Sequence, residues 1–285
     1  MKFKVIILDV DGTLFSSEKE ILPETKKALF KAQNKGIKVV LASGRPTSGL
    51  VAIGNELELK KYHGLFISYN GSKVVDAKTM ETLFNEPLSV SEAKAVLEHM
   101  KNFEVKPMID KDRHMHVNNV YDPMIKYKGV DVNIIEYEAR GANYLLCEQD
   151  DLAEFLDYEV NKILTAATPA YLEANYEAMM DPFKDTLNCV FTAPFYFEFT
   201  AKGIDKAKAI DTVLKPMGYK PSEMIAFGDG MNDLSMLKYV GVAVAMENAV
   251  DEVKDHVQHI TSSNDEEGIA NALYHYLPEL KDTII

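Results

Sequence analysis

The sequence predicts an α/β fold in which a parallel sheet is interrupted by an inserted α+β segment. Short apolar runs rich in β-branched residues indicate strands buried on both faces, and they occur at residues 5–8, 37–41, 65–67 and 224–227. Stretches with helical spacing separate several of these runs, which gives the alternation typical of α/β proteins. The alternation stops in the middle of the chain and resumes near its end, which indicates the insertion.

The N-terminal part of the chain carries the first strands of this sheet. A helix is expected over residues 23–35, because Pro23 suits a first helical turn and Gly36 suits the stop. The connections between parallel strands are expected to be right-handed crossovers. Residues 74–84 are expected to form a small hairpin.

The middle of the chain is expected to form a separate α+β domain over residues 85–199, inserted into an α/β domain of residues 1–84 and 200–285. Its expected helices lie at residues 89–100, 150–159 and 169–180. Its expected strands lie at residues 105–109, 114–117, 162–166 and 187–191. In the last part of the chain, a strand is expected at residues 242–245, and helices are expected at residues 203–217, 231–238, 249–255 and 266–276.

Composition and charge exclude several classes of protein. A chain of 285 residues, 47% of them hydrophobic, can bury a sizeable core without disulfides. Cys147 and Cys189 lie far apart without metal-ligand spacing, so both are expected to be buried thiols. A formal charge of -13 disfavours nucleic acid as a partner. No apolar run approaches the roughly 20 residues of a membrane span, and the sequence predicts a cytoplasmic enzyme or binding protein.

Polar segments follow the buried strands at the edge where open parallel sheets bind ligands. These segments are residues 9–13 (DVDGT), 43–46 (SGRP), 69–71 (YNG) and 228–233 (GDGMND). Four carboxylates would gather at one edge, and a divalent cation or a shared proton would have to offset their repulsion. Oxygen ligands without His or Cys favour Mg²⁺ over zinc. A lone Asp-x-Asp is usually a strand-end turn, but here the later polar segments fall at the same edge.

Four ordered motifs resemble those of the haloacid-dehalogenase-like (HAD) phosphohydrolases, and within them the Cof-type, YidA-like sugar-phosphate phosphatases. The matching segments are residues 9–14 (DVDGTL), 43–46 (SGRP), 202–206 (KGIDK) and 228–233 (GDGMND). Residues 245–249 (AMENA) and 261–268 (TSSNDEEG) also resemble this subgroup, although relatives often have Gly at Glu247. The resemblance implies a Rossmann-like parallel-sheet core and a C2B-type cap formed by the inserted stretch.

The resemblance also implies catalytic roles. Asp9 would be the nucleophile that forms an aspartyl-phosphate, and Asp11 would act as general acid and then as general base. Lys206 would offset charge in the transition state. The residues implied for phosphate binding are Thr13, Ser43, Gly44, Arg45, Asn70 and Asn232.

The same resemblance implies how Mg²⁺ is held. The side chains of Asp9 and Asp229 and the backbone carbonyl of Asp11 would bind the ion, and Asp233 would hold a metal-bound water or orient Lys206.

Other assignments stay open at this point. Asn70 is equally well explained by an Asn-Gly turn before a hairpin. Arg45 could contact the substrate or the cap, or pair with a surface carboxylate. The polar, locally cationic residues 112–129 are interpreted as a solvated hairpin and loop in preference to a substrate contact. His114 and His116 lack a third metal ligand nearby.

Three functions compete. The first is a Mg²⁺-dependent phosphatase acting on small phosphomonoesters, with sugar phosphates as the expected substrates. The second is a phosphomutase, since relatives with similar caps move phosphate within a sugar. The third is a regulatory protein that binds a phosphorylated metabolite with little turnover. The expected partner is a small-molecule phosphomonoester, with neither nucleic acid nor membrane, and the chain could be a monomer or a homodimer.

Overall fold

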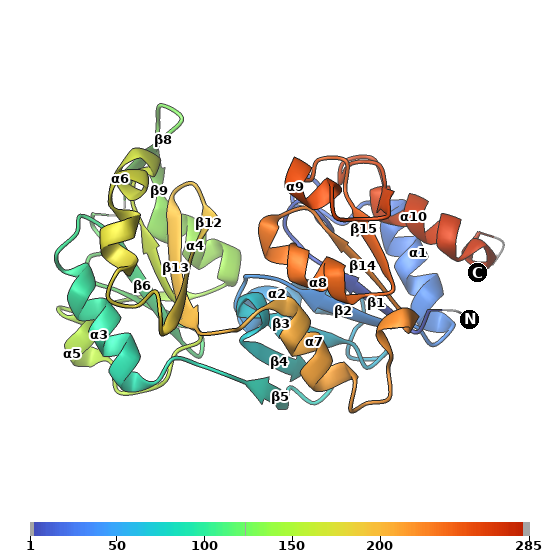
Figure 1. The fold of residues 1–285 in the computed structure, drawn as a ribbon, viewed down its shortest axis with the longest axis horizontal. Coiled ribbons are helices and arrows are strands. Elements are labelled where there is room, and N and C mark those ends of the chain that lie inside the picture. Colours follow the sequence, from blue (N-terminus) through green and yellow to red (C-terminus); the bar gives the residue numbers. More distant parts are fainter. Residues whose placement is uncertain (1–2, 123, 282–285) are drawn as a thin grey trace. The chain divides into compact units, whose positions relative to one another are not determined.

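The computed structural model describes residues 3–122 and 124–281, which fall into two compact units (Figure 1). The core unit comprises the chain up to Phe84 together with the residues from Asp205 onward, and the inserted unit is Asn85–Ile204. The sequence placed the end of the insertion at residue 199. The inserted unit ends later because its last strand, β13, continues to Ala201.

The core unit contains a sheet with the strand order β16-β15-β14-β1-β2-β3-β4-β5. Six strands run parallel: β1 (Val5–Leu8), β2 (Lys38–Ala42), β3 (Leu65–Ser68), β14 (Met224–Gly228), β15 (Val242–Ala245) and β16 (His259–Ile260). Strand β4 (Lys73–Asp76) runs antiparallel to β3, and β5 (Thr82–Asn85) completes the sheet. The predicted parallel sheet is confirmed.

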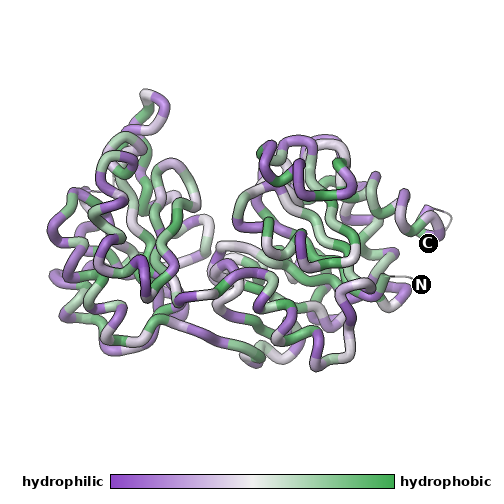
Figure 2. The backbone as a smooth tube through the Cα atoms, viewed as in Figure 1, coloured by the Kyte–Doolittle hydropathy of each residue, from purple (hydrophilic) through white to green (hydrophobic). Residues whose placement is uncertain are grey.

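Helices cover both faces of this sheet, which explains the continuous apolar runs in its strands. Ile6 and Leu8 of β1 pack in one cluster, and Val5 and Ile7 pack in the other. The first cluster includes side chains of α1 (Pro23–Asn34), α2 (Thr47–Glu56) and α10 (Gly268–Tyr276). The second includes side chains of α7 (Lys206–Leu214), α8 (Leu234–Tyr239) and α9 (Asp251–Lys254). The hydrophobic strands stand out along the backbone in Figure 2.

The inserted unit is an α+β layer structure with its own core. Its sheet has the order β10 (Leu145–Glu148), β7 (His114–Val117), β6 (Lys106–Lys111), β11 (Ile163–Ala166), β13 (Tyr196–Ala201) and β12 (Leu187–Ala193). One face packs against α3 (Val90–Met100), α5 (Leu152–Phe155) and α6 (Pro169–Met180). The other packs against α4 (Ile134–Ala142) and the hairpin of β8 (Met124–Tyr127) and β9 (Val130–Asn133).

Several elements of the inserted unit differ from the predictions. Helix α5 is much shorter than the expected 150–159, and α4 and β8–β10 were not predicted. Half of the residues of β8 and β9 are exposed and polar residues interrupt the apolar ones, so neither strand carries a continuous apolar run. Strand β13 was also missed; it contains the buried Glu198, whose charge is offset by Lys162 at 3.0 Å.

Helix α2 of the core unit was not located from the sequence either. Its N-terminus lacks a side-chain cap, and two glycines, Gly49 and Gly54, lie within it. Within the described residues, no helix is long and apolar enough to cross a membrane.

Candidate active site

The polar segments predicted from the sequence meet at the carboxyl ends of neighbouring parallel strands. Leu8 of β1 lies in register with Leu41 of β2 and with Phe227 of β14. Asp9 therefore begins its loop at the same level as the loops after β2 and β14, and its backbone N–H donates to the carbonyl of Phe227 at 3.1 Å.

Lys206 lies at the centre of a buried ionic network. Its Nζ is 2.6 Å from Oδ1 of Asp9 and 2.5 Å from Oδ1 of Asp233, and the lysine side chain is fully buried. The other oxygen of Asp233 accepts the backbone N–H groups of Asp229 and Gly230, each at 3.0 Å. Asp233 thus orients both the lysine and the loop that carries Asp229.

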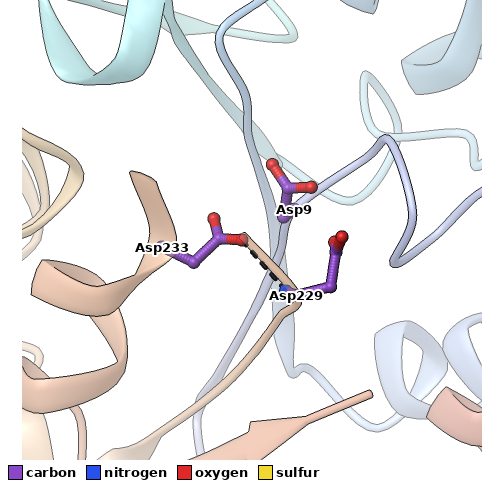
Figure 3. Close-up of side chains that lie close together, drawn as sticks. All are labelled: Asp9, Asp229 and Asp233. Atoms are coloured by element: carbon purple, nitrogen blue, oxygen red, sulfur yellow. Dashed lines mark hydrogen bonds between the residues drawn. The ribbon is translucent and has the colours of Figure 1, made fainter. Parts of the chain in front are cut away.

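Asp9, Asp229 and Asp233 form a compact acidic cluster (Figure 3). One carboxylate oxygen from each lies within 4.8 Å of the others. Burial and the charge of Asp233 raise the pKa of Asp9 well above its ordinary value, although Lys206 opposes the rise. Burial raises the pKa of Asp229 to about 6, against the effect of a hydrogen bond from Thr13. Burial alone would lower the pKa of Lys206, but Asp233 and Asp9 raise it, so the lysine stays charged.

The chemistry of this donor set fits a hard divalent cation. Lys206 pairs with two of the three carboxylates, Asp9 and Asp233, so the cluster contains more acidic than basic groups. The ligands are oxygens alone, which suits Mg²⁺. Burial raises the pKa of both Asp9 and Asp229, and Lys206 offsets this effect only in part.

Asp11 lies outside the acidic cluster and pairs with Arg45. Arg45 Nε donates to Oδ2 of Asp11 at 2.7 Å, and Nη2 donates to Oδ1 at 2.6 Å. The guanidinium carbon also lies 5.5 Å from the ring centroid of Phe15. Of the roles that the sequence left open for Arg45, the structure shows pairing with a carboxylate, and that carboxylate belongs to the first motif.

Gly12 is required by the close approach of two loops. It has a φ of +80°, which favours glycine, and a Cβ at this position would lie 2.4 Å from Oδ2 of Asp229. Thr13 follows directly, and its Oγ1 donates to Oδ1 of Asp229 at 2.6 Å. The loops of the first and fourth motifs are therefore in direct contact.

The remaining phosphate-binding candidates also lie together. Ser43 is buried, and its Oγ accepts the backbone N–H of Arg45 at 3.1 Å. Asn232 donates to Oδ1 of Asn70 at 3.1 Å, and a Cβ on Gly44 would lie 3.0 Å from Nδ2 of Asn70. Asn70 has a φ of +54° and so also serves as the turn residue that the sequence suggested.

Sequence reasoning assigned no role to one residue beside this site. Asn248 donates from Nδ2 to the carbonyl of Gly12 at 2.8 Å. Its segment, residues 245–249, resembles the Cof-type subgroup in sequence. The chemistry of a single amide did not indicate a contact with the first motif.

The candidates in the inserted unit form no metal site among the described residues. His116 packs against Phe155 and hydrogen-bonds Gln149, and neither it nor His114 belongs to a group with metal-binding spacing. Cys147 and Cys189 are free thiols, but both are half-buried and not fully buried as expected.

Comparisons with known proteins agree with the fold and give the family. The model of the haloacid dehalogenase-like hydrolase family matches residues 6–273, and the chain belongs to this family. It is 30% identical to YcsE of Bacillus subtilis, a 5-amino-6-(5-phospho-D-ribitylamino)uracil phosphatase, over 96% of each chain.

Two solved structures show the same fold. A haloacid dehalogenase-like hydrolase from Bacteroides thetaiotaomicron superposes with a TM-score of 0.88 at 32% identity, covering 97% of this chain and 100% of that one. The subclass IIB sugar phosphatase BT4131 superposes with a TM-score of 0.79 at 26% identity, covering 96% and 98%.

Proposed function

We propose that this protein is a Mg²⁺-dependent phosphatase that hydrolyses small phosphomonoesters through an aspartyl-phosphate on Asp9. The observation that carries this proposal is the buried cluster of Asp9, Asp229 and Asp233 around Lys206 at the carboxyl ends of the parallel strands. A carboxylate next to a fixed positive charge can attack phosphorus while the charge of the phosphoryl oxygens is offset.

The first step transfers the phosphoryl group to the enzyme. Oδ of Asp9 forms a bond to phosphorus as the ester P–O bond breaks, and Asp11 donates a proton to the leaving alkoxide. In the second step Asp11 removes a proton from water, which attacks the aspartyl-phosphate and releases inorganic phosphate and free Asp9. Lys206 stays charged throughout and offsets the charge on the transferring group.

Mg²⁺ would be held by the carboxylates of Asp9 and Asp229 and by the backbone carbonyl of Asp11. When bound, the ion supplies positive charge that screens the phosphate from the attacking carboxylate. Asp233 holds Lys206 in position for offsetting charge on the phosphoryl group, and it holds the Asp229 loop in position for binding Mg²⁺.

A sugar or polyol phosphate is the substrate class that the comparisons favour. BT4131 is a sugar phosphatase, and YcsE acts on the phosphate of a ribityl chain. The inserted unit is proposed as the cap, which in a phosphatase supplies contacts to the leaving group and excludes water.

The proposal is tested by phosphate release from a panel of hexose, pentose and polyol phosphates, nucleotides and pyridoxal phosphate, with and without Mg²⁺. We expect metal-dependent release from some of these compounds and its loss in Asp9→Asn. Asp255→Asn, an exposed position of the core unit directly after α9, is the matched control and should retain full activity. Release without Mg²⁺, or an active Asp9→Asn variant that is folded by circular dichroism, would contradict the mechanism.

A further inference from the structure

The loop after β1 makes hydrogen bonds with three side chains from the C-terminal part of the chain. Asn248 Nδ2 donates to the carbonyl of Gly12, and Asn264 Nδ2 donates to the carbonyl of Phe15, both at 2.8 Å. Asp265 accepts the backbone N–H and the hydroxyl of Ser17, both at 2.7 Å. We call residues 261–268, which carry Asn264 and Asp265, the C-terminal latch.

Asn248 is itself fixed on two sides. Its Oδ1 accepts the backbone N–H of Asn264 in the latch at 3.0 Å. The backbone around it is bonded to the segment of the fourth motif, because the Met246 N–H donates to Gly228 at 3.2 Å and the Val250 N–H donates to Asp229 at 3.1 Å. Asn248 therefore joins the loop that carries Asp229 to the loop that carries Asp11.

Gly12 is the point at which these two loops touch. A Cβ there would lie 2.4 Å from Oδ2 of Asp229, so the glycine backbone lies directly against that carboxylate. The amide of Asn248 holds the Gly12 carbonyl and so limits how far this backbone can move away from Asp229. The backbone of Asp11 immediately precedes Gly12 and moves with it.

We propose that Asn248 is a positioning residue that sets the spacing between Asp229 and the backbone of Asp11, and through this spacing the Mg²⁺ affinity of the acidic site. The inference rests on the proposed function in that Mg²⁺ is the ion bound there. Groups that orient metal ligands without touching the metal commonly change affinity by about 10- to 100-fold when they are removed.

The test is calorimetric titration of the substrate-free protein with Mg²⁺. We expect the Kd to rise by about tenfold or more in both Asn248→Ala and Asn248→Asp. Asn248→Asp is the sharper variant: it keeps the size and the acceptor for Asn264 but loses the donor to Gly12. Its added negative charge would by itself attract a cation, so weaker binding has to come from the lost donor.

Asn102→Asp is the matched control for the change of side chain. Asn102 is also exposed, and its Nδ2 donates to a backbone carbonyl, that of His99, at 2.9 Å, but it lies in the inserted unit. The Kd of this control should equal that of the unmodified protein. Because Asn248 is exposed, its variants are expected to fold, which thermal unfolding checks.

The outcomes separate this inference from the proposed function. Unchanged Mg²⁺ binding in a folded Asn248→Ala variant, which loses the donor without gaining charge, overturns the role of Asn248 and leaves the phosphatase proposal standing. Mg²⁺ binding that weakens in the Asn248 variants, in a protein that releases phosphate from no ester, supports the positioning role and overturns the phosphatase proposal. An unmodified protein that binds no Mg²⁺ overturns both.

Discussion

At the scale of single residues, the site is defined by one buried lysine among three carboxylates, two of which, Asp9 and Asp229, have pKa values raised by burial. Lys206 is fully buried and pairs with Asp9 and Asp233, while Asp229 has no lysine within pairing distance among the ion pairs of the described residues. The buried charge is thus incompletely offset in the protein alone. A bound cation would offset this imbalance, which also makes the charge of the site sensitive to pH.

Mg²⁺ affinity should fall as the pH is lowered through about 6. The pKa of Asp229 is raised to about 6, so below that value a proton competes with the metal for this carboxylate. Protonation of Asp229 alone would weaken binding about tenfold between pH 7 and pH 5, and the raised pKa of Asp9 acts in the same direction. Calorimetric Kd values at pH 5, 6 and 7 measure this, and a Kd independent of pH would exclude it.

Replacing Asp229 with Asn should stabilise the metal-free protein at neutral pH. Because the folded-state pKa exceeds the ordinary 3.8, the ionised carboxylate destabilises the fold above pH 6, and this cost falls as the pH drops from about 6 towards 4. The rise to about 6 corresponds to about 3 kcal/mol at most. Asparagine keeps the oxygen that accepts from Thr13.

Urea unfolding of the metal-free protein and of Asp229→Asn at pH 7 and pH 5 tests this prediction. The difference in the free energy of unfolding between the two should shrink at pH 5, where Asp229 is already largely protonated. A variant that is less stable than the parent at pH 7 would show that Asp229 stabilises the fold in its charged form.

At the scale of elements, the C-terminal latch also caps the N-terminus of helix α1. The residue before this helix, Leu22, provides no side-chain cap. Glu267 supplies it instead, since its two carboxylate oxygens accept the backbone N–H groups of Glu24 at 2.9 Å and Thr25 at 2.7 Å. A negative charge at a helix N-terminus also interacts favourably with the helix dipole.

Glu267→Ala should therefore lower the free energy of unfolding by about 1 kcal/mol, as the loss of an N-cap commonly does. Glu267→Gln retains one acceptor oxygen and should cost less. Urea unfolding of both variants gives the comparison, with Glu266→Ala, an exposed neighbour, as the control. Equal stability of Glu267→Ala and the unmodified protein would show that water replaces the cap.

The same elements show why some of the site was predictable from sequence. Asp9, Ser43 and Asp229 follow buried apolar runs, and parallel strands place their carboxyl ends at one edge. The contact of Asn248 with Gly12 was not predictable from its segment, because it joins residues 236 positions apart through one amide hydrogen bond. Local patterns carry no information about such a contact.

At the scale of the whole molecule, two units with separate cores share one chain. The core unit was predicted well because its strands are buried on both faces and so carry continuous apolar runs. The inserted unit was predicted less completely because several of its elements are short or exposed, such as β9 and α5. Its strand β13 buries Glu198 beside Lys162, a pairing that the sequence pattern alone did not reveal.

The central claim is that Asp9 carries the phosphoryl group between the two steps, and trapping that intermediate tests it most directly. The enzyme would be quenched in acid during turnover of a ³²P-labelled sugar phosphate and then digested. We predict label on the peptide that contains Asp9, and no label in Asp9→Asn. Steady hydrolysis by the unmodified protein with the label on a different residue, or full turnover by Asp9→Asn, would contradict the account.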